Sequence, residues 1–277
     1  MKFPISLLGG ALTLFTSTSA SVAARPNGHA PNFARNVEPT CITPGIVPNV
    51  TGSQIRNVSV VLFQALDMID VFGPLDPLQI LALSAQQLNL RLIAETLDPV
   101  STAPVGMNKF NSSFFPTIPP TSTFDDDLDI DLLIVPGGPG ARNPNLQVVT
   151  GYIAKMYPKI KVMMTICTGA GVAARSGVLD GHLATTNKNA WVTMKEMGPK
   201  VNWVSPARYV IDGKVWSSSG VTSGLDIIFA FIGTFWGTEQ SDRIASIIEH
   251  VPRVATDDPF SKHFNITPTE AQPCSQA

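Results

Sequence analysis

The chain has 277 residues, 44% of them hydrophobic, which suits one large α/β domain with a buried core better than two full domains. Its 19 basic and 21 acidic side chains nearly balance, and no basic cluster occurs. The composition therefore indicates neither a nucleic-acid partner nor a membrane surface, and leaves small molecules as the expected partners.

The amino terminus has the pattern of a cleaved signal peptide. Lys2 precedes an apolar run over residues 5–15, and the small residues Val22-Ala23-Ala24 follow it. The run is much shorter than the roughly 20 residues that span a bilayer, which disfavours a membrane anchor. We therefore predict a signal peptide at residues 1–24 and a secreted protein.

Four Asn-X-Ser/Thr sites agree with a secretory route. They begin at Asn49, Asn57, Asn111 and Asn265, and each could carry a glycan. Asn57 adjoins a predicted core strand, so it is the weakest candidate of the four.

Two of the three cysteines lie near the ends of the chain. Cys41 belongs to a Pro-rich arm at residues 25–55, and Cys274 to a polar carboxy-terminal tail at 251–277. In an oxidising compartment these two can form a disulfide while Cys167 stays free. The alternative is that both tail cysteines are unpaired.

Between these ends, residues 56–250 alternate between strand and helix patterns. Strands are expected at 58–63, 90–97, 131–135, 161–166, 182–186, 201–204, 208–211 and 215–217, and helices at 74–87, 146–156, 168–176, 190–197, 222–235 and 238–249. Residues 100–124 suggest edge hairpins and loops, and Asp212-Gly213 suggests a tight hairpin. The alternation predicts an α/β domain with a doubly wound, mostly parallel sheet.

Cys167 lies between an apolar run and small residues, in Ile166-Cys167-Thr168-Gly169-Ala170. A strand that ends here and a helix that begins at Thr168 would place Cys167 on a sharp turn, a nucleophile elbow. The positive end of the helix favours a thiolate, so we expect a lowered pKa. Gly169 and Gly171 should leave room beside the sulfur. The alternative is a small buried hydrophobic residue.

A Gly-rich turn at residues 136–140 follows the strand at 131–135. It lacks the Lys-Ser/Thr ending of a Walker loop and the GxGxxG spacing, which argues against nucleotide binding. Its backbone N–H groups, that of Gly138 in particular, are expected to face the reactive centre.

The Gly-rich turn, the Cys167 elbow, and the runs at 176–186 and 218–226 together resemble the ThiJ/PfpI superfamily over about residues 56–250. The segment at 68–74, which contains Asp70, looks most like the isonitrile hydratase branch. The resemblance implies a single flavodoxin-like domain of the class I glutamine amidotransferase-like type, a homodimer, and no cofactor.

The same resemblance implies that Asp70, in the turn after the first strand, approaches Cys167. A thiolate can attack the electrophilic isonitrile carbon, and a carboxyl group can protonate that carbon and later activate water. Gly138, Thr168 and Gly169 would hold the water or the developing charge. Without the resemblance, Asp70 would be a turn or helix-capping residue.

One position departs from several branches of the superfamily. Asn187-Lys188 follows Thr185-Thr186, where those branches have His and Trp, so a histidine base is missing. Thr168, directly after the cysteine, disagrees with the Cys-His peptidases.

The remaining charged residues are expected to have structural roles, not catalytic or metal-binding ones. The four histidines show no metal-ligand spacing, so we predict no metal, and His182 is expected to pack on its strand. Asp226 should complement a helix dipole, and the acidic run at 125–131 should form a solvated loop.

The sequence thus predicts a secreted, cysteine-dependent hydratase that converts an isonitrile to an N-substituted formamide. One alternative is a glyoxalase or deglycase acting on 2-oxoaldehydes. Another is a non-enzymatic protein of the same superfamily whose cysteine senses oxidants.

Overall fold

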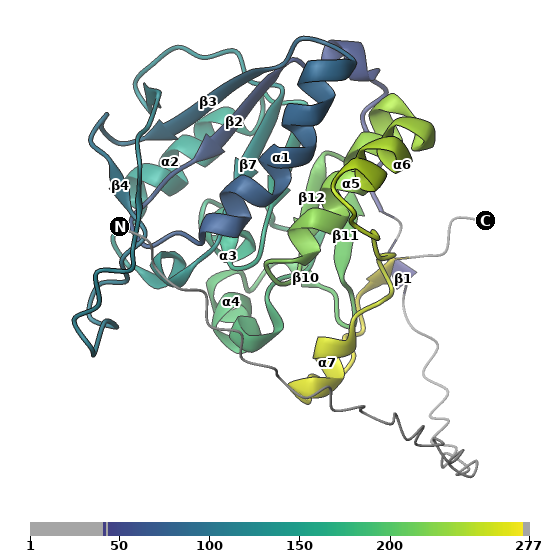
Figure 1. Ribbon diagram of the computed structural model, residues 1–277. Coiled ribbons are helices and arrows are strands. Elements are labelled where there is room, and N and C mark those ends of the chain that lie inside the picture. The colour runs from purple at the N-terminus through teal and green to yellow at the C-terminus, as the bar shows by residue number, and fades with distance from the viewer. Residues whose placement is uncertain (1–40, 43, 274–277) are drawn as a thin grey trace, which may run out of the picture. The chain divides into compact units, whose positions relative to one another are not determined.

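A seven-stranded sheet forms the centre of the fold (Figure 1). The computed structural model describes residues 41, 42 and 44–273. Every neighbouring pair in the order β11-β12-β8-β7-β2-β3-β6 is parallel except β11 with β12. The strands are β2 (Asn57–Val61), β3 (Asn89–Ala94), β6 (Ser122–Thr123), β7 (Leu132–Val135), β8 (Val162–Thr165), β11 (Tyr209–Asp212) and β12 (Val215–Ser218).

The chain starts this sheet in its interior. From β2 it passes to β3 on one side, returns to β7 on the other side of β2, and continues through β8 to β12. The carboxyl ends of β2 and β7 therefore border a switch point, where open α/β sheets bind ligands. The predicted doubly wound, mostly parallel sheet is confirmed.

Helices cover both faces of the sheet (Figure 1). On one face α1 (Met68–Ser84) packs against α5 (Ser223–Trp236) and α6 (Thr238–Ile247). On the other, α2 (Gln147–Met156) packs against α3 (Gly169–Arg175), which also contacts α4 (Trp191–Met197). Single 3-10 turns occupy Gly52–Gln54, Pro139–Arg142 and Lys188–Ala190.

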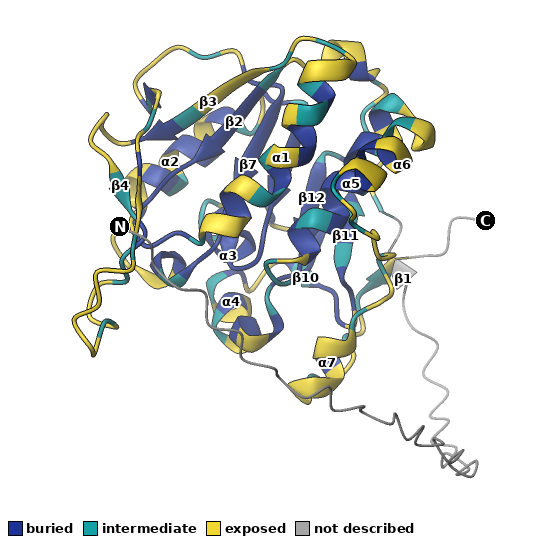
Figure 2. Ribbon diagram, in the orientation of Figure 1, coloured by how far each residue is buried: buried dark blue, intermediate teal, exposed yellow. Residues whose placement is uncertain are grey.

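The core lies between the sheet and its helices (Figure 2). Strands β7 and β8 are buried at every position, as expected for parallel strands covered on both faces. Trp216 of β12 is fully buried and meets the Phe231 ring of α5 edge-on at 5.5 Å between centroids. The almost wholly apolar α5 is thus the buried helix that its sequence predicts.

Helix α1 begins six residues earlier than predicted, at Met68 rather than Pro74. The sequence rule places proline at the start of a helix, but Pro74 and Pro77 both lie inside α1. The start is instead fixed by Asp67, whose carboxylate accepts a hydrogen bond from the N–H of Ile69 at 3.0 Å. Asp70 therefore lies in the first turn of a helix and not in the preceding loop.

Short strands complete the described chain. The predicted hairpin at Asp212-Gly213 is confirmed by the antiparallel pairing of β11 with β12. The parallel pair β9 (Leu183–Ala184) and β10 (Asn202–Trp203) lies outside the main sheet, as does the antiparallel pair β4 (Val100–Ser101) and β5 (Thr117–Ile118). The predicted tail contains a helix, α7 (Pro259–His263), and β13 (Gln272–Pro273), which pairs with β1 (Cys41–Ile42).

Two aspartates expected to be solvated or to complement a helix dipole are instead buried and bind several partners each. Asp226 is buried at the start of α5, where it pairs with Arg208 and accepts hydrogen bonds from Arg253 N–H at 2.9 Å and from His250 at 3.1 Å. Asp131 is buried as well, and it binds Lys161 and the backbone N–H of Arg56 and Asn57. The acidic run at 125–131 is therefore a solvated loop only as far as the residues before Asp131.

The predicted signal peptide, the arm as far as residue 40, and Cys274 lie outside the described residues. No helix within the described part is both long and apolar enough to cross a membrane.

Candidate active site

Three segments meet at the carboxyl ends of β2, β7 and β8. They are the first turn of α1 with Asp70, the Gly-rich turn at 136–140, and the elbow between β8 and α3 with Cys167. Asp70, Cys167 and Thr168 are all buried. The fold thus brings together residues that are far apart in the sequence.

Cys167 has the strained backbone of a nucleophile elbow. Its φ is 58°, in the left-handed region that a residue with a Cβ adopts rarely. The hydroxyl of Thr186 donates a hydrogen bond to the Cys167 carbonyl at 2.9 Å and so supports this conformation. The predicted sharp turn between a strand and a helix is therefore present.

Gly138 and Thr168 tie the Gly-rich turn to the elbow. The N–H of Gly138 donates to the Thr168 hydroxyl at 2.9 Å, and that hydroxyl donates back to the Gly138 carbonyl at 3.1 Å. Gly138 has a φ of 125°, and a Cβ on it would lie 2.5 Å from the backbone nitrogen of Asp67, so only glycine fits. The Gly138 amide is consequently engaged with Thr168.

Gly169 and Gly171 do not open space beside the sulfur. A Cβ on Gly169 would lie 2.2 Å from the Val135 carbonyl oxygen, and one on Gly171 would lie 2.2 Å from the Met194 sulfur. The N–H of Gly169 donates to the Ile166 carbonyl at 2.8 Å, which takes it away from a substrate. Gly169 was expected to hold water or developing charge. Its place in the structure indicates a packing role instead, because the missing side chain lets α3 approach β7 closely.

Asp70 is a buried carboxyl group with one free oxygen. Oδ2 accepts a hydrogen bond from the N–H of Gly137 at 2.8 Å, whereas Oδ1 has no partner among the described groups. Burial, assisted by the charge of Asp67, raises the pKa of Asp70 to about 8, although the Gly137 N–H and the Cys167 thiol act in the opposite direction. Asp70 is therefore mainly protonated at pH 7.

The expectation of a lowered pKa at Cys167 is wrong. Burial, followed by the nearby charge of Asp70, raises the pKa of this thiol to about 12. The N–H of Thr168 and the side chain of Asn187 act to lower it but do not prevail. In the free protein at pH 7, the sulfur is a thiol that faces a neutral carboxyl group.

Asn187 is a site residue to which the sequence assigned no role. Its Nδ2 donates to the Cys167 sulfur at 3.2 Å, and its Oδ1 accepts from the N–H of Ala190 at 3.2 Å. The only sequence signal was the departure from His at this position. His182, by contrast, lies between the Tyr157 hydroxyl, at 3.0 Å, and Asp212, at 2.8 Å, which is the packing place expected for it.

The predicted glycan acceptors differ in their surroundings. Asn49, Asn111 and Asn265 are exposed. Asn57 is half-buried, donates to Asp129 at 3.1 Å and accepts from Asn89 at 2.8 Å. Among the described residues, no group of three or more potential metal ligands occurs.

A sequence profile of the DJ-1/PfpI family matches residues 56–234. The isonitrile hydratase of Pseudomonas putida is 25% identical over 198 residues, which cover 70% of this chain and 78% of that protein. The HTH-type transcriptional regulator GbdR of Pseudomonas aeruginosa is 28% identical over 130 residues, but these are only 35% of the regulator.

Solved structures show the same fold. A ThiJ/PfpI family protein from Pseudomonas syringae aligns with a TM-score of 0.58 and 19% identity, over 82% of this chain and 84% of that one. At this identity the likeness concerns the fold alone.

The raised pKa of Asp70 makes its contribution to stability depend on pH. The folded protein keeps this proton up to about pH 8, and the unfolded chain loses it near 3.8, so the stabilisation is complete below 3.8 and is lost as pH rises through about 8. Wild type should therefore lose stability relative to Asp70→Asn as pH rises. The difference in the free energy of unfolding between Asp70→Asn and wild type should shift in favour of the variant by on the order of a few kcal/mol from pH 5 to pH 9. Thermal melts of both proteins at the two pH values measure this.

Asp127→Asn is the matched control, because Asp127 is an exposed aspartate that lies away from the site and from the groove beside α1. It should melt with wild type at both pH values. A difference between Asp70→Asn and wild type that is the same at pH 5 and pH 9 would show that Asp70 is ionised throughout.

Proposed function

This protein belongs to the DJ-1/PfpI family, and from that premise we propose that it is a cysteine-dependent hydratase that converts an isonitrile to an N-substituted formamide. The pair formed by the Cys167 thiol and the buried, protonated Asp70 carboxyl group carries the proposal. The similarity to the isonitrile hydratase of Pseudomonas putida supports it.

The first step adds the thiol across the isonitrile carbon. The sulfur forms a bond to that carbon, Asp70 donates its proton to the same carbon, and the carboxyl group takes up the thiol proton on its other oxygen. The product is a thioimidate, R–N=CH–S–Cys167, and Asp70 ends the step protonated. Oδ1, the oxygen without a partner, is the one available to the substrate.

The second step consumes one water. Water adds to the thioimidate carbon while a proton passes through Asp70 to the nitrogen, and the carbon–sulfur bond then breaks as the hydroxyl proton returns to the sulfur. The Nδ2 group of Asn187 stabilises negative charge on the leaving sulfur. Thr168 acts as a positioning residue, because its hydroxyl holds the Gly-rich turn against the elbow.

The two alternatives have less support from the site. A redox sensor needs an accessible, low-pKa cysteine, whereas Cys167 is buried and its pKa is raised. A glyoxalase that uses a histidine base would find Asn187 at the position beside the sulfur. Consumption of a 2-oxoaldehyde such as methylglyoxal is therefore the competing outcome of the activity test.

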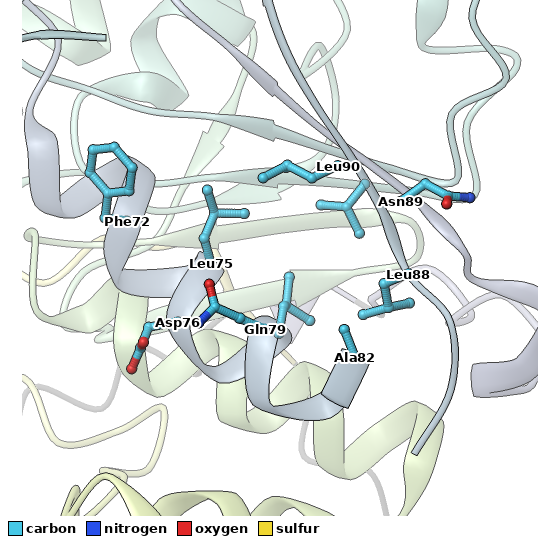
Figure 3. Close-up of a pocket in the computed structure, with 10 residues that line it drawn as sticks. Phe72, Leu75, Asp76, Gln79, Ala82, Leu88, Asn89 and Leu90 are labelled. Carbon is cyan, nitrogen blue, oxygen red and sulfur yellow. The ribbon is translucent and has the colours of Figure 1, made fainter. Parts of the chain in front are cut away.

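We also propose that the protein is a homodimer whose second copy covers the groove between α1 and β3. This groove has a volume of about 590 Å³ and is lined by apolar side chains such as Leu75, Leu88 and Leu90 (Figure 3). Phe72, which lines the same groove, is 49% exposed and adds aromatic surface that a second copy could cover.

A secretory origin and a Cys41–Cys274 disulfide remain part of the proposal. The pairing of β1 with β13 supports the disulfide, because it sets the backbone of Cys41 beside that of Gln272, two residues before Cys274 in the sequence. The exposed Asn49, Asn111 and Asn265 are the acceptors that a glycosylating enzyme could reach.

Wild-type protein should form N-substituted formamide from an isonitrile, and Cys167→Ala should form none. Asp70→Asn should slow turnover by roughly 10² to 10⁴, and Asp70→Glu should retain more activity. Since Asp70 must be protonated to donate, kcat/KM in wild type should fall as pH rises above about 8. Product is measured by mass spectrometry over a pH series.

Asp127→Asn is again the control and should keep wild-type turnover. Full activity in Asp70→Asn, or consumption of methylglyoxal by a wild type that leaves isonitriles untouched, would refute the hydratase function.

Light scattering after size exclusion should give the mass of two copies for wild type. Phe72→Glu should shift the protein to one copy, because a charge would be buried in the apolar contact. Phe110→Glu should leave the dimer intact, because Phe110 is an exposed phenylalanine that does not line the groove. A dimer that survives Phe72→Glu would place the interface elsewhere.

Protein secreted from a eukaryotic host should begin at Arg25. Peptide mapping without reductant should recover Cys41 linked to Cys274 and Cys167 as a free thiol. Recovery of all three as free thiols would contradict the disulfide, and an intact Met1 would contradict the signal peptide.

A further inference from the structure

A buried ion pair joins the family-matched part of the chain to its carboxy-terminal segment. Lys188 Nζ lies 3.3 Å from Asp258 Oδ2, and both side chains are almost fully buried. The ammonium group also donates to Thr185 Oγ1 at 2.8 Å and to the Ala207 carbonyl at 2.9 Å. Removal of either charge would leave the other buried without its charged partner, which is strongly destabilising.

The same carboxylate fixes helix α7. Asp258 Oδ1 accepts from the N–H of Phe260 at 3.0 Å and of Ser261 at 3.2 Å, and its Oδ2 accepts from the Ser261 hydroxyl at 2.6 Å. Asp258 is thus both the cap of α7 and the partner of Lys188. This arrangement determines where Phe260 and Phe264 lie.

The two phenylalanines border a cavity beside Asn187. The cavity has a volume of about 240 Å³, and its walls come from Asn187 and Lys188, from residues 219–223, and from Phe260 and Phe264. It is smaller than the roughly 300–1,000 Å³ that holds drug-sized ligands, so its occupant must be small. Asn187 links it to the reactive centre, since its Nδ2 is 3.2 Å from the sulfur.

We propose that this cavity binds the apolar substituent of the substrate, and that Phe260 and Phe264 form its aromatic wall. The lining combines polar side chains, among them Asn187 and Ser219, with the apolar surface of Val221, Phe260 and Phe264. A molecule with a compact polar reacting group and an apolar ring or chain matches this combination. Phe260 lies on α7 and Phe264 is the residue that ends it, and both lie outside residues 56–234, which match the family profile.

The assignment of an isonitrile as the substrate rests on the proposed function, but the cavity itself can be tested without it. Wild type, Phe260→Ala and Phe264→Ala are assayed with methyl isonitrile and benzyl isonitrile. For each variant, kcat/KM should fall roughly tenfold or more with the benzyl compound and stay unchanged with the methyl compound.

The second readout is alkylation of Cys167 by iodoacetamide and by N-benzyliodoacetamide at one pH. In each reaction a carbon–sulfur bond forms, iodide leaves and the thiol proton goes to buffer. Wild type should react faster with the benzyl reagent, and both variants should lose this preference. Val221→Trp, which narrows the cavity without altering α7, should lose it as well.

Phe110→Ala is the matched control, because Phe110 is 92% exposed and lines none of these walls. It should behave as wild type in both assays. Unchanged benzyl preference in Phe260→Ala, Phe264→Ala and Val221→Trp would overturn the proposal. A preference in alkylation that the variants lose, with no isonitrile turnover in wild type, would refute the hydratase function and leave the cavity assigned.

Discussion

The close approach of α3 to the end of β7 is the constraint on which the site depends. Because Gly169 has no side chain, the first turn of α3 can lie against the carbonyl of Val135. The chain reaches that position only by turning sharply at Cys167, with a positive φ. Thr168 and Gly138 then close the gap with two hydrogen bonds, so the sulfur, the Gly-rich turn and Asp70 are held in a fixed relation.

This tight packing also decides the charge state of the site. The N–H of Thr168 and the side chain of Asn187 favour a thiolate, but burial of Cys167 and the nearby charge of Asp70 outweigh them and raise the pKa of the thiol. The result is a pair of neutral acids whose protons are coupled. Such a pair suits addition of H–S across a carbon that needs both a nucleophile and a proton.

Much of the fold could be predicted from the sequence, because buried parallel strands such as β7 and β8 are short apolar runs and their turns contain glycine. The elbow at Cys167 follows from the same signals. The start of α1 could not be predicted, since Pro74 suggested a boundary that tertiary packing overrides. Asn187, Lys188 and Asp258 were missed because their partners lie 20, 70 and 70 residues away along the chain, at distances that no local pattern records.

The Lys188–Asp258 pair also shows that the family-matched segment does not complete its own interior. Lys188 is buried within residues 56–234, yet its carboxylate partner belongs to a segment that the family profile does not include. A chain cut at residue 234 would lose Asp258 and with it the charge that faces the Lys188 ammonium group.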